Sequence, residues 1–225
     1  MGLDLGVGGP AARWALLAAF VLGGTYLFGM TGDANPTVML AWKGAGVWLL
    51  AIYAALNARS NDGWLIAVVM AMGALGDVLV ERNVTAGAAA FAVGHIIAAI
   101  LYLRHRRVQL DETQKWLGIV TVPAVVMIGW SLTHDPMATL YSLFLGVMAA
   151  SAWISRFPRY RVGIGAMLFV ASDLLIFARM GTETPEPWMT FAIWLLYFVG
   201  QVLIVLGVTE MLSARDADQD LAHEG

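Results

Sequence analysis

The sequence predicts an all-α fold: a polytopic membrane bundle of eight transmembrane helices. The chain has 225 residues, of which 60% are hydrophobic and only 13% are charged, a composition outside the range of ordinary soluble domains. The apolar residues fall into eight long runs, and a bilayer core of about 30 Å requires about 20 apolar residues in a helix. Short polar connections separate these runs and leave no room for a soluble domain.

The eight runs follow one another along the chain with a turn signal between neighbours. The first run lacks a small-residue cleavage site, so we expect a retained helix rather than a signal peptide. Breaker clusters such as 61–63 (Asn-Asp-Gly) and 134–136 (His-Asp-Pro) mark the later turns. The expected spans are Trp14 to Met30, Val38 to Leu56, Gly63 to Val80, Val84 to Leu103, Trp116 to Leu132, Met137 to Ile154, Val162 to Met180 and Trp188 to Leu212.

Residues 1–212 are expected to form a single transmembrane domain. The remaining residues, 213–225, are polar and acidic, which is typical of a solvated, disordered tail. The chain has no cysteine, which excludes disulfides, a thiolate nucleophile and cysteine metal ligands.

The distribution of basic residues predicts the orientation, because lysine and arginine are retained on the cytoplasmic side. With both termini inside, ten basic residues fall on the cytoplasmic side and two on the other, with Lys43 inside a helix. We therefore predict an N-in, C-in topology. The cytoplasmic group is Arg13, Arg59, Arg104, Arg106, Arg107, Lys115, Arg156, Arg159, Arg161 and Arg215, and the opposite group is Arg82 and Arg179.

Two aspartates lie inside the expected membrane spans, and such residues indicate function by default. Asp77 and Asp173 each follow a small residue and precede three aliphatic residues. Counting at a rise of about 1.5 Å per residue places both carboxyl groups, with Lys43, in the non-cytoplasmic half of the membrane. Glu81, one turn beyond Asp77, is expected at the rim of the same helix face.

Other polar residues of the spans lie at similar depths. The same count places Tyr141 and Tyr197 in the non-cytoplasmic half, and His95 and Gln201 near the midplane. The cytoplasmic halves are almost bare of such groups. We therefore expect a polar cavity that opens toward the non-cytoplasmic side.

A second pair of similar segments indicates an internal repeat. Residues 91–97 in the fourth span (Phe-Ala-Val-Gly-His-Ile-Ile) align with 197–203 in the eighth (Tyr-Phe-Val-Gly-Gln-Val-Leu). Because four spans separate the partners, both copies run in the same direction, as in a parallel four-plus-four repeat. The second and sixth spans show little similarity.

These residue types allow acid and base catalysis. Two carboxyl groups at one apolar site can serve as one general acid and one general base, a pairing suited to hydrolysis of an acid-labile carbon–oxygen bond. Three alternatives stay open: a structural role in which Asp77 and Asp173 only tie helices together, a proton-coupled transporter of lipid or small molecules, and a protein that binds lipid without catalysis. For Lys43 the open roles are counter-ion, snorkelling side chain and substrate ligand, and for His95 they are a hydrogen bond between helices and a direct chemical role.

The sequence lacks the motifs of several other enzyme classes. It contains no Gly-x-Ser-x-Gly elbow, no phosphate-binding glycine loop, no His-Glu-x-x-His and no histidine cluster. We therefore expect no cofactor and no metal. Membrane lipid and a small lipid substrate are the expected partners, nucleic acid is not, and the oligomeric state is left open.

From Lys43 to Leu206 the chain resembles the YhhN family of lysoplasmalogenase-like membrane proteins. The resemblance rests on the size, the eight-span hydropathy and the order of the motifs. Here Lys43 precedes glycine where the family usually has proline, and aliphatic residues replace a tyrosine often found after the histidine. The matching elements are Lys43, Gly76-Asp77-Val78-Leu79, Phe91 with His95, Tyr141, the stretch 165–173 that ends in Ser172-Asp173, and Tyr197 with Gln201.

The resemblance implies hydrolysis of the vinyl ether bond of a lysoplasmalogen, a lysophospholipid, to a fatty aldehyde and a glycerophospho-headgroup. Asp77 and Asp173, the two carboxyl groups inside the spans, are the expected catalytic residues. The substrate phosphate is expected near Lys43 or Arg82, with Glu81, His95, Tyr141, Ser172, Tyr197 and Gln201 as further substrate-binding candidates. The expected location is a bacterial inner (cell) membrane.

Overall fold

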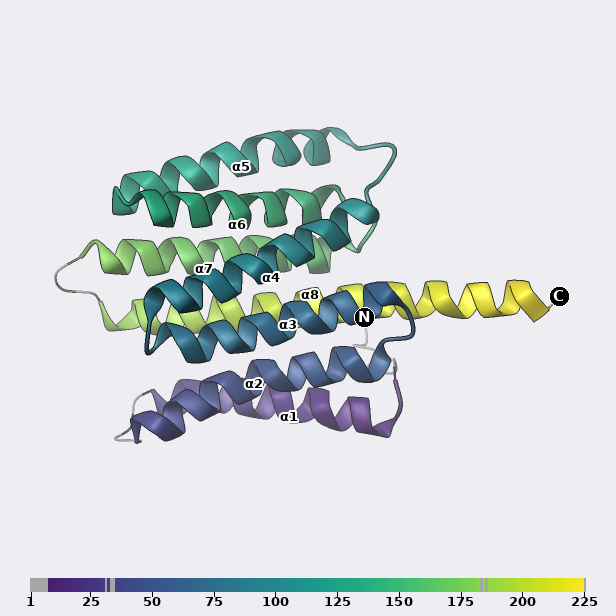
Figure 1. The fold of residues 1–225 in the computed structure, drawn as a ribbon, viewed down its shortest axis with the longest axis horizontal. Helices are drawn as coiled ribbons and strands as arrows, with labels where there is room; N and C mark the ends of the chain where they lie inside the picture. The colour runs from purple at the N-terminus through teal and green to yellow at the C-terminus, as the bar shows by residue number, and fades with distance from the viewer. Residues whose placement is uncertain (1–7, 31, 33–34, 183, 185, 225) are drawn as a thin grey trace. The chain divides into compact units, whose positions relative to one another are not determined.

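Every regular element in the described part of the chain is a helix. The computed structural model describes residues 8–30, 32, 35–182, 184 and 186–224. Within them, eight helices are long and apolar enough to cross a membrane, which confirms the predicted all-α fold and makes the chain an integral membrane protein. The helices are α1 (Pro10–Gly29), α2 (Pro36–Asn57), α3 (Asn61–Val80), α4 (Val84–Arg104), α5 (Glu112–Thr133), α6 (Pro136–Ile154), α7 (Ile164–Met180), preceded by the π-helix η1 (Arg159–Gly163), and α8 (Pro187–Glu224) (Figure 1).

The hairpin between α5 and α6 shows how the polar connections end the helices. His134 adopts a left-handed conformation, with φ of 50°, and its backbone N–H donates to the carbonyl of Trp130 at 2.8 Å. The next residue, Asp135, accepts hydrogen bonds from the backbone N–H groups of Met137 at 2.6 Å and Ala138 at 3.1 Å. These contacts satisfy backbone groups that have no partner within either helix. The hairpin therefore sets where α5 ends and where α6 begins.

The chain divides into two compact units. Unit 1 comprises the described residues of 1–94 and 205–225, and within it α2 packs against both α1 and α3. Unit 2 comprises the described residues of 95–204, and within it α5, α6 and α7 pack against one another. The helices α4 and α8 each contribute one part to unit 1 and the other to unit 2. A single domain over residues 1–212 remains a prediction.

In each unit a glycine marks a close crossing between a helix and its neighbour. In unit 1, a Cβ atom on Gly94 of α4 would lie 3.3 Å from the Cβ of Met72 and 3.7 Å from the carbonyl oxygen of Val69, both in α3. In unit 2, a Cβ atom on Gly200 of α8 would lie 2.8 Å from the carbonyl oxygen of Gly165 in α7.

The partners of these two glycines occupy matching positions. Val69 precedes Asp77 by eight residues, and Gly165 precedes Asp173 by the same number. Leu168 and Met72 also correspond, because each precedes its aspartate by five residues. The Cβ of Leu168 lies 3.5 Å from the Cβ position on Gly200, and the Cβ of Met72 lies 3.3 Å from the Cβ position on Gly94. Matching contacts of this kind are what a parallel repeat predicts, and the repeat itself remains a prediction.

Helix α8 continues beyond the predicted span, as far as Glu224. The sequence favoured disorder for residues 213–225, whereas the structure places 213–224 in the helix, and Gly225 lies outside the described residues. Adding residues to an existing helix requires no new nucleation, which explains how a polar segment can stay helical. The Nη1 atom of Arg215 also lies 4.0 Å from Oδ2 of Asp62 in α3.

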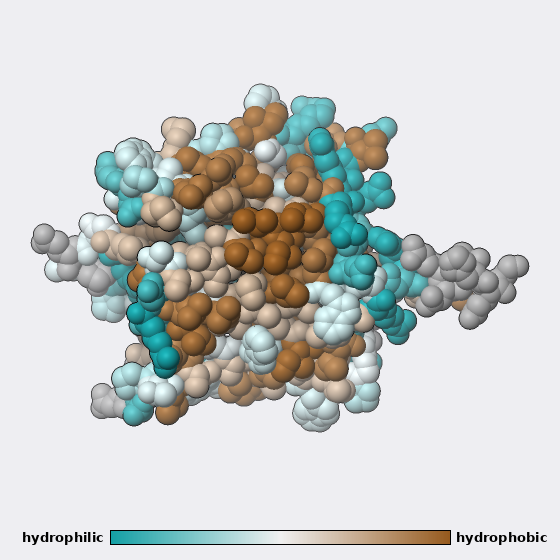
Figure 2. Space-filling model, viewed as in Figure 1, coloured by the Kyte–Doolittle hydropathy of each residue, from teal (hydrophilic) through white to brown (hydrophobic). Residues whose placement is uncertain are grey.

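Large apolar side chains lie exposed on the helices. Trp48 of α2, Leu75 of α3 and Leu195 of α8 are examples. On the face drawn in Figure 2, hydrophobic residues gather over the middle stretches of the helices, and hydrophilic residues gather toward the helix ends. Extensive exposed apolar surface is unfavourable in water and is the expected exterior of helices surrounded by lipid.

The crossing of α7 and α8 predicts a stability difference between two glycine variants. A Cβ atom on Gly165 would lie 2.8 Å from the carbonyl of Gly200 and 3.1 Å from the Cβ of Leu203, so Gly165→Ala must push the backbones apart. We expect it to cost about 1–3 kcal/mol and to lower the unfolding temperature in detergent, measured by circular dichroism. Gly24→Ala is the control, because nothing lies within 4 Å of that position. Equal unfolding temperatures for the two variants would contradict the close crossing.

Candidate functional site

A lysine and two carboxylates lie together in unit 1, at one end of α3. The Nζ atom of Lys43 in α2 lies 2.7 Å from Oε1 of Glu81 and 4.0 Å from Oδ1 of Asp77. Asp77 is buried, whereas the side chain of Glu81 is 52% exposed. We call Lys43, Asp77 and Glu81 the lysine cluster. It places one cation between a buried and an exposed anion.

Small residues bring the helices of the lysine cluster close together. A Cβ atom on Gly44 would lie 2.8 Å from Cγ2 of Val78 in α3, so the residue beside Lys43 allows α2 to approach α3 closely. The helix α2 runs without interruption from Pro36 to Asn57. On the other side of α3, the ring of Phe91 packs onto Gly76, within 2.7 Å of its Cβ position.

A hydrogen-bonded chain joins three polar side chains in unit 2. The hydroxyl of Tyr141 in α6 donates to Oδ2 of Asp173 in α7 at 2.5 Å. The same hydroxyl lies 3.0 Å from Nε2 of His95 in α4. Because a phenol has one proton and gives it here to the carboxylate, its oxygen accepts from His95, and the network assigns a proton to Nε2. We call His95, Tyr141 and Asp173 the tyrosine cluster.

Aromatic rings enclose the tyrosine cluster. The ring of Phe169 lies edge-on to His95, with centroids 4.9 Å apart, and also to Tyr197, with centroids 5.1 Å apart. The ring of Phe177 lies edge-on to Tyr141 at 6.0 Å. His95 and Asp173 are both buried. The cluster is therefore a polar chain within an apolar, aromatic wall.

Phe169 and Phe177 were not predicted from the sequence as site residues. They lie four residues before and four residues after Asp173 in α7, so all three share one helix face. That spacing is the signal that would have identified them. The two rings therefore flank the carboxylate along its own helix.

The other predicted site residues take different positions. The side-chain amide of Gln201 donates to the hydroxyl of Tyr197 at 3.3 Å, and both residues are buried. The hydroxyl of Ser172 donates to the backbone carbonyl of Ile193 at 2.9 Å, so it links α7 to α8. Arg82 is exposed, and within the described residues its side chain has neither a hydrogen bond nor an ion pair.

The lysine cluster and the tyrosine cluster have similar arrangements but different chemical groups. In each, a buried aspartate meets a proton donor from the preceding helix: Lys43 of α2 beside Asp77, and Tyr141 of α6 beside Asp173. The donors occupy corresponding places in the proposed repeat, although the sequences of these two helices are dissimilar. One aspartate therefore has a cationic neighbour and the other a neutral one.

Metal ligands do not gather in the part of the chain that the structure describes: no group of three or more histidine, cysteine, aspartate or glutamate residues is placed to hold a metal ion there. The groups that do gather are carboxylates, an ammonium, a phenol and an imidazole. All of these hold or transfer protons near neutral pH or in buried sites. The expectation that the protein uses no metal remains a prediction.

The YhhN family model matches residues 38–208, about three quarters of the chain. No curated protein and no solved structure matches the chain. The matched range contains every residue of the lysine cluster and of the tyrosine cluster. It ends within α8, shortly before the polar end of that helix.

The tyrosine cluster predicts that one hydroxyl holds three helices together. Tyr141→Phe keeps the ring contact with Phe177 but removes hydrogen bonds to two buried polar groups, which we expect to cost about 1–3 kcal/mol. Tyr102→Phe is the matched control, since the buried Tyr102 hydroxyl has no hydrogen-bond partner among the described residues. Thermal unfolding in detergent should show a loss for Tyr141→Phe alone. Equal losses for the two variants would contradict the network.

Proposed function

The chain belongs to the YhhN family, and from this premise we propose that it is a membrane hydrolase of lysoplasmalogens. The reaction would cleave the vinyl ether bond and release a fatty aldehyde and a glycerophospho-headgroup. The observation that carries the proposal is the pair of buried aspartates, Asp77 with the ammonium of Lys43 4.0 Å away and Asp173 with a hydrogen bond from Tyr141. Vinyl ethers are acid-labile, so a pair of positioned carboxyl groups supplies what their hydrolysis requires.

The proposed reaction has three steps and consumes one water. One carboxyl group donates a proton to the vinyl carbon that does not bear oxygen, and the oxygen-bearing carbon becomes an oxocarbenium ion. The other carboxylate accepts a proton from water as the water oxygen bonds to that carbon, which gives a hemiacetal. The hemiacetal then breaks its bond to the glycerol oxygen, which takes the proton held by the second carboxyl group, while the hemiacetal hydroxyl returns its proton to the first; the products are the aldehyde and a glycerol hydroxyl, and both carboxyl groups regain their starting states. Asp77 and Asp173 are proposed to supply the two carboxyl groups.

The lysine cluster supports a role in recognising the headgroup. A phosphoethanolamine or phosphocholine group carries one negative and one positive charge. Lys43 and Glu81 offer the complementary pair, with their charged atoms 2.7 Å apart and Glu81 half-exposed. In the proposed complex the phosphate replaces Glu81 as the partner of Lys43, and the ammonium group lies beside Glu81. Arg82, exposed on the following turn, adds positive charge near the phosphate.

A proton-coupled transporter is the second candidate. It is favoured by one observation, the matching glycine contacts at Gly94 and Gly200, since parallel repeats are common in carriers. The hydrogen bonds that link His95, Tyr141 and Asp173 would then serve as a path for protons. A carrier leaves its lipid unaltered, and this difference separates the two candidates experimentally.

The hydrolase proposal predicts the activity of three variants. Purified protein in detergent, incubated with lysoplasmenylethanolamine, should release fatty aldehyde. Asp77→Asn and Asp173→Asn should each lower kcat by about 10²- to 10⁴-fold, the usual contribution of a general acid or base. Asp62→Asn is the matched control, because Asp62 is also a buried aspartate of α3 but lies beside Arg215, and it should keep wild-type activity.

Full activity in both aspartate variants would reject Asp77 and Asp173 as the general acid and base. Unaltered lipid, together with uptake into proteoliposomes that depends on a pH gradient, would reject the hydrolase and favour the transporter. A chelator present throughout the assay tests the expectation that no metal is required.

The proposed orientation places both termini in the cytoplasm of a bacterial cell and the site on the non-cytoplasmic side. Since the chain has no cysteine, single cysteines report exposure without background. In spheroplasts, a membrane-impermeant maleimide should label Thr182→Cys and should not label Val108→Cys, whose loop precedes α5. Permeabilised cells should label both variants. The reverse pattern in intact spheroplasts would invert the topology.

A further inference from the structure

Basic residues concentrate in two loops of unit 2. Residues 104–115, from the last residue of α4 to the first turn of α5, and residues 155–161, between α6 and α7, contain seven basic residues and two acidic ones. The positive-inside rule accounts for basic residues near span ends. It does not require the loops that carry them to adopt a defined structure. We name these seven the basic loop surface: Arg104, Arg106, Arg107, Lys115, Arg156, Arg159 and Arg161.

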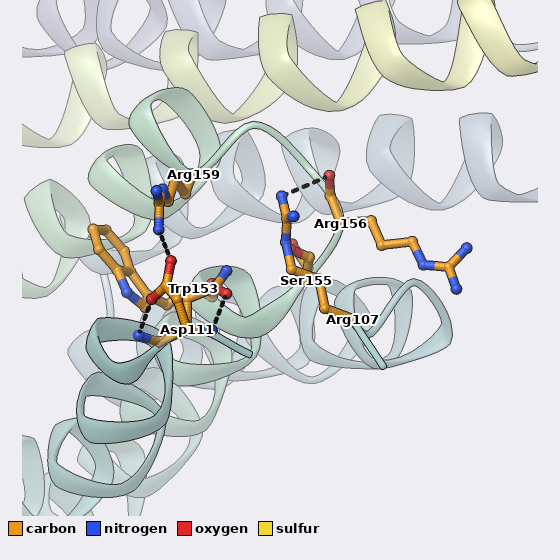
Figure 3. A network of polar contacts seen from close by, with 7 residues as sticks. Arg107, Asp111, Trp153, Ser155, Arg156 and Arg159 are labelled. Carbon is orange, nitrogen blue, oxygen red and sulfur yellow. Dashed lines mark hydrogen bonds and ion pairs between the residues drawn. The ribbon is translucent and has the colours of Figure 1, made fainter. Parts of the chain in front are cut away.

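Backbone pairing joins the two loops. Arg106 and Ser155 form an isolated antiparallel β-bridge. The backbone N–H of Arg107 donates to the carbonyl of Ile154 at 3.1 Å, and that of Arg156 donates to the carbonyl of His105 at 2.7 Å. The guanidinium Nε of Arg107 adds a hydrogen bond to the carbonyl of Ser155 at 2.8 Å (Figure 3). The two loops therefore form one ordered platform.

Both acidic residues of the two loops form ion pairs near the start of α5. Asp111 pairs with Arg159 (Figure 3), and the backbone N–H of Gln114, with the guanidinium of Arg159, lowers the pKa of the Asp111 carboxyl. The other acidic residue, Glu112, pairs with Lys115 at 2.6 Å. Both anions of the loops thus have a cation within the same loops, and positive charge remains in excess.

Two arginines of the surface stay available for an external anion. Arg106 and Arg156 are exposed, and within the described residues their guanidinium groups have no hydrogen bond or ion pair. In Figure 3 the side chain of Arg156 extends away from the Asp111–Arg159 pair. The backbones of both residues are held by the loop pairing, so the two guanidinium groups project from fixed positions.

Exposed apolar and aromatic side chains accompany the charges. Tyr160 is 70% exposed, with the guanidinium carbon of Arg159 5.1 Å from its ring centre, and Trp116 is 65% exposed. Aromatic residues at span ends are typical of the layer of lipid headgroups. Charged residues interspersed with such rings fit the surface of a bilayer better than a soluble partner. We propose that the basic loop surface binds the phosphate groups of anionic phospholipids in its own membrane leaflet.

This binding is independent of the proposed hydrolysis and is measured without it. The full chain in detergent is titrated with phosphatidylglycerol or phosphatidylcholine, and bound lipid is counted by native mass spectrometry. We expect tighter binding of phosphatidylglycerol. The double variant Arg106→Gln/Arg156→Gln should weaken that binding by about thirtyfold, from about 1 kcal/mol for each basic side chain at a membrane surface and a factor of ten for each 1.4 kcal/mol. Phosphatidylcholine binding should not change.

The matched control is Arg13→Gln/Arg59→Gln, which removes the same charge from exposed positions of unit 1 and should keep the preference. The same loss in this control, or an unchanged preference in Arg106→Gln/Arg156→Gln, would overturn the proposal. Displacement of phosphatidylglycerol by millimolar inorganic phosphate would identify free phosphate as the ligand instead. Salt-sensitive self-association that disappears in the Arg106→Gln/Arg156→Gln variant would identify a second copy of the chain.

Discussion

The cost of placing a carboxylate within a membrane bundle is the constraint that organises this structure. A charged group at the centre of a bilayer costs at least about 2.5–3.5 kcal/mol, and a buried anion is tolerated only with partners. Asp77 and Asp173 each have such a partner on the preceding helix, Lys43 and Tyr141. The helices that contribute these donors must therefore lie close to α3 and α7 at a defined depth.

Glycines make that proximity possible. Gly44 removes the side chain that would separate α2 from α3 beside Lys43, and Gly76 leaves space for the ring of Phe91 next to Asp77. In unit 2, Gly165 and Gly200 bring the backbones of α7 and α8 into contact. Between membrane helices, close van der Waals packing takes the part that the hydrophobic effect plays in water. Packing and polar pairing thus depend on the same small residues.

The two aspartates have unlike surroundings, and this asymmetry bears on the proposed chemistry. Asp77 lies beside an ammonium group and near an exposed second carboxylate, whereas Asp173 lies among aromatic rings and accepts a hydrogen bond from a phenol. Acid and base catalysis requires two carboxyl groups that behave differently at one pH. Different neighbours at corresponding positions of a repeat are a simple way to obtain that difference.

Hydropathy alone determined the fold class and the eight spans, because lipid requires long apolar helices whatever their packing. Counting residues along the spans also predicts the depth of Asp77, Asp173 and Lys43, and that depth remains a prediction. Which side chains meet was decided by tertiary structure. The pairing of Tyr141 with Asp173 depends on how α6 and α7 pack, and the contribution of Phe169 and Phe177 depends on which face of α7 points inward. The continuation of α8 to Glu224 could not be predicted from composition either. Polar residues that are typical of a disordered tail can extend a helix that packing has already formed.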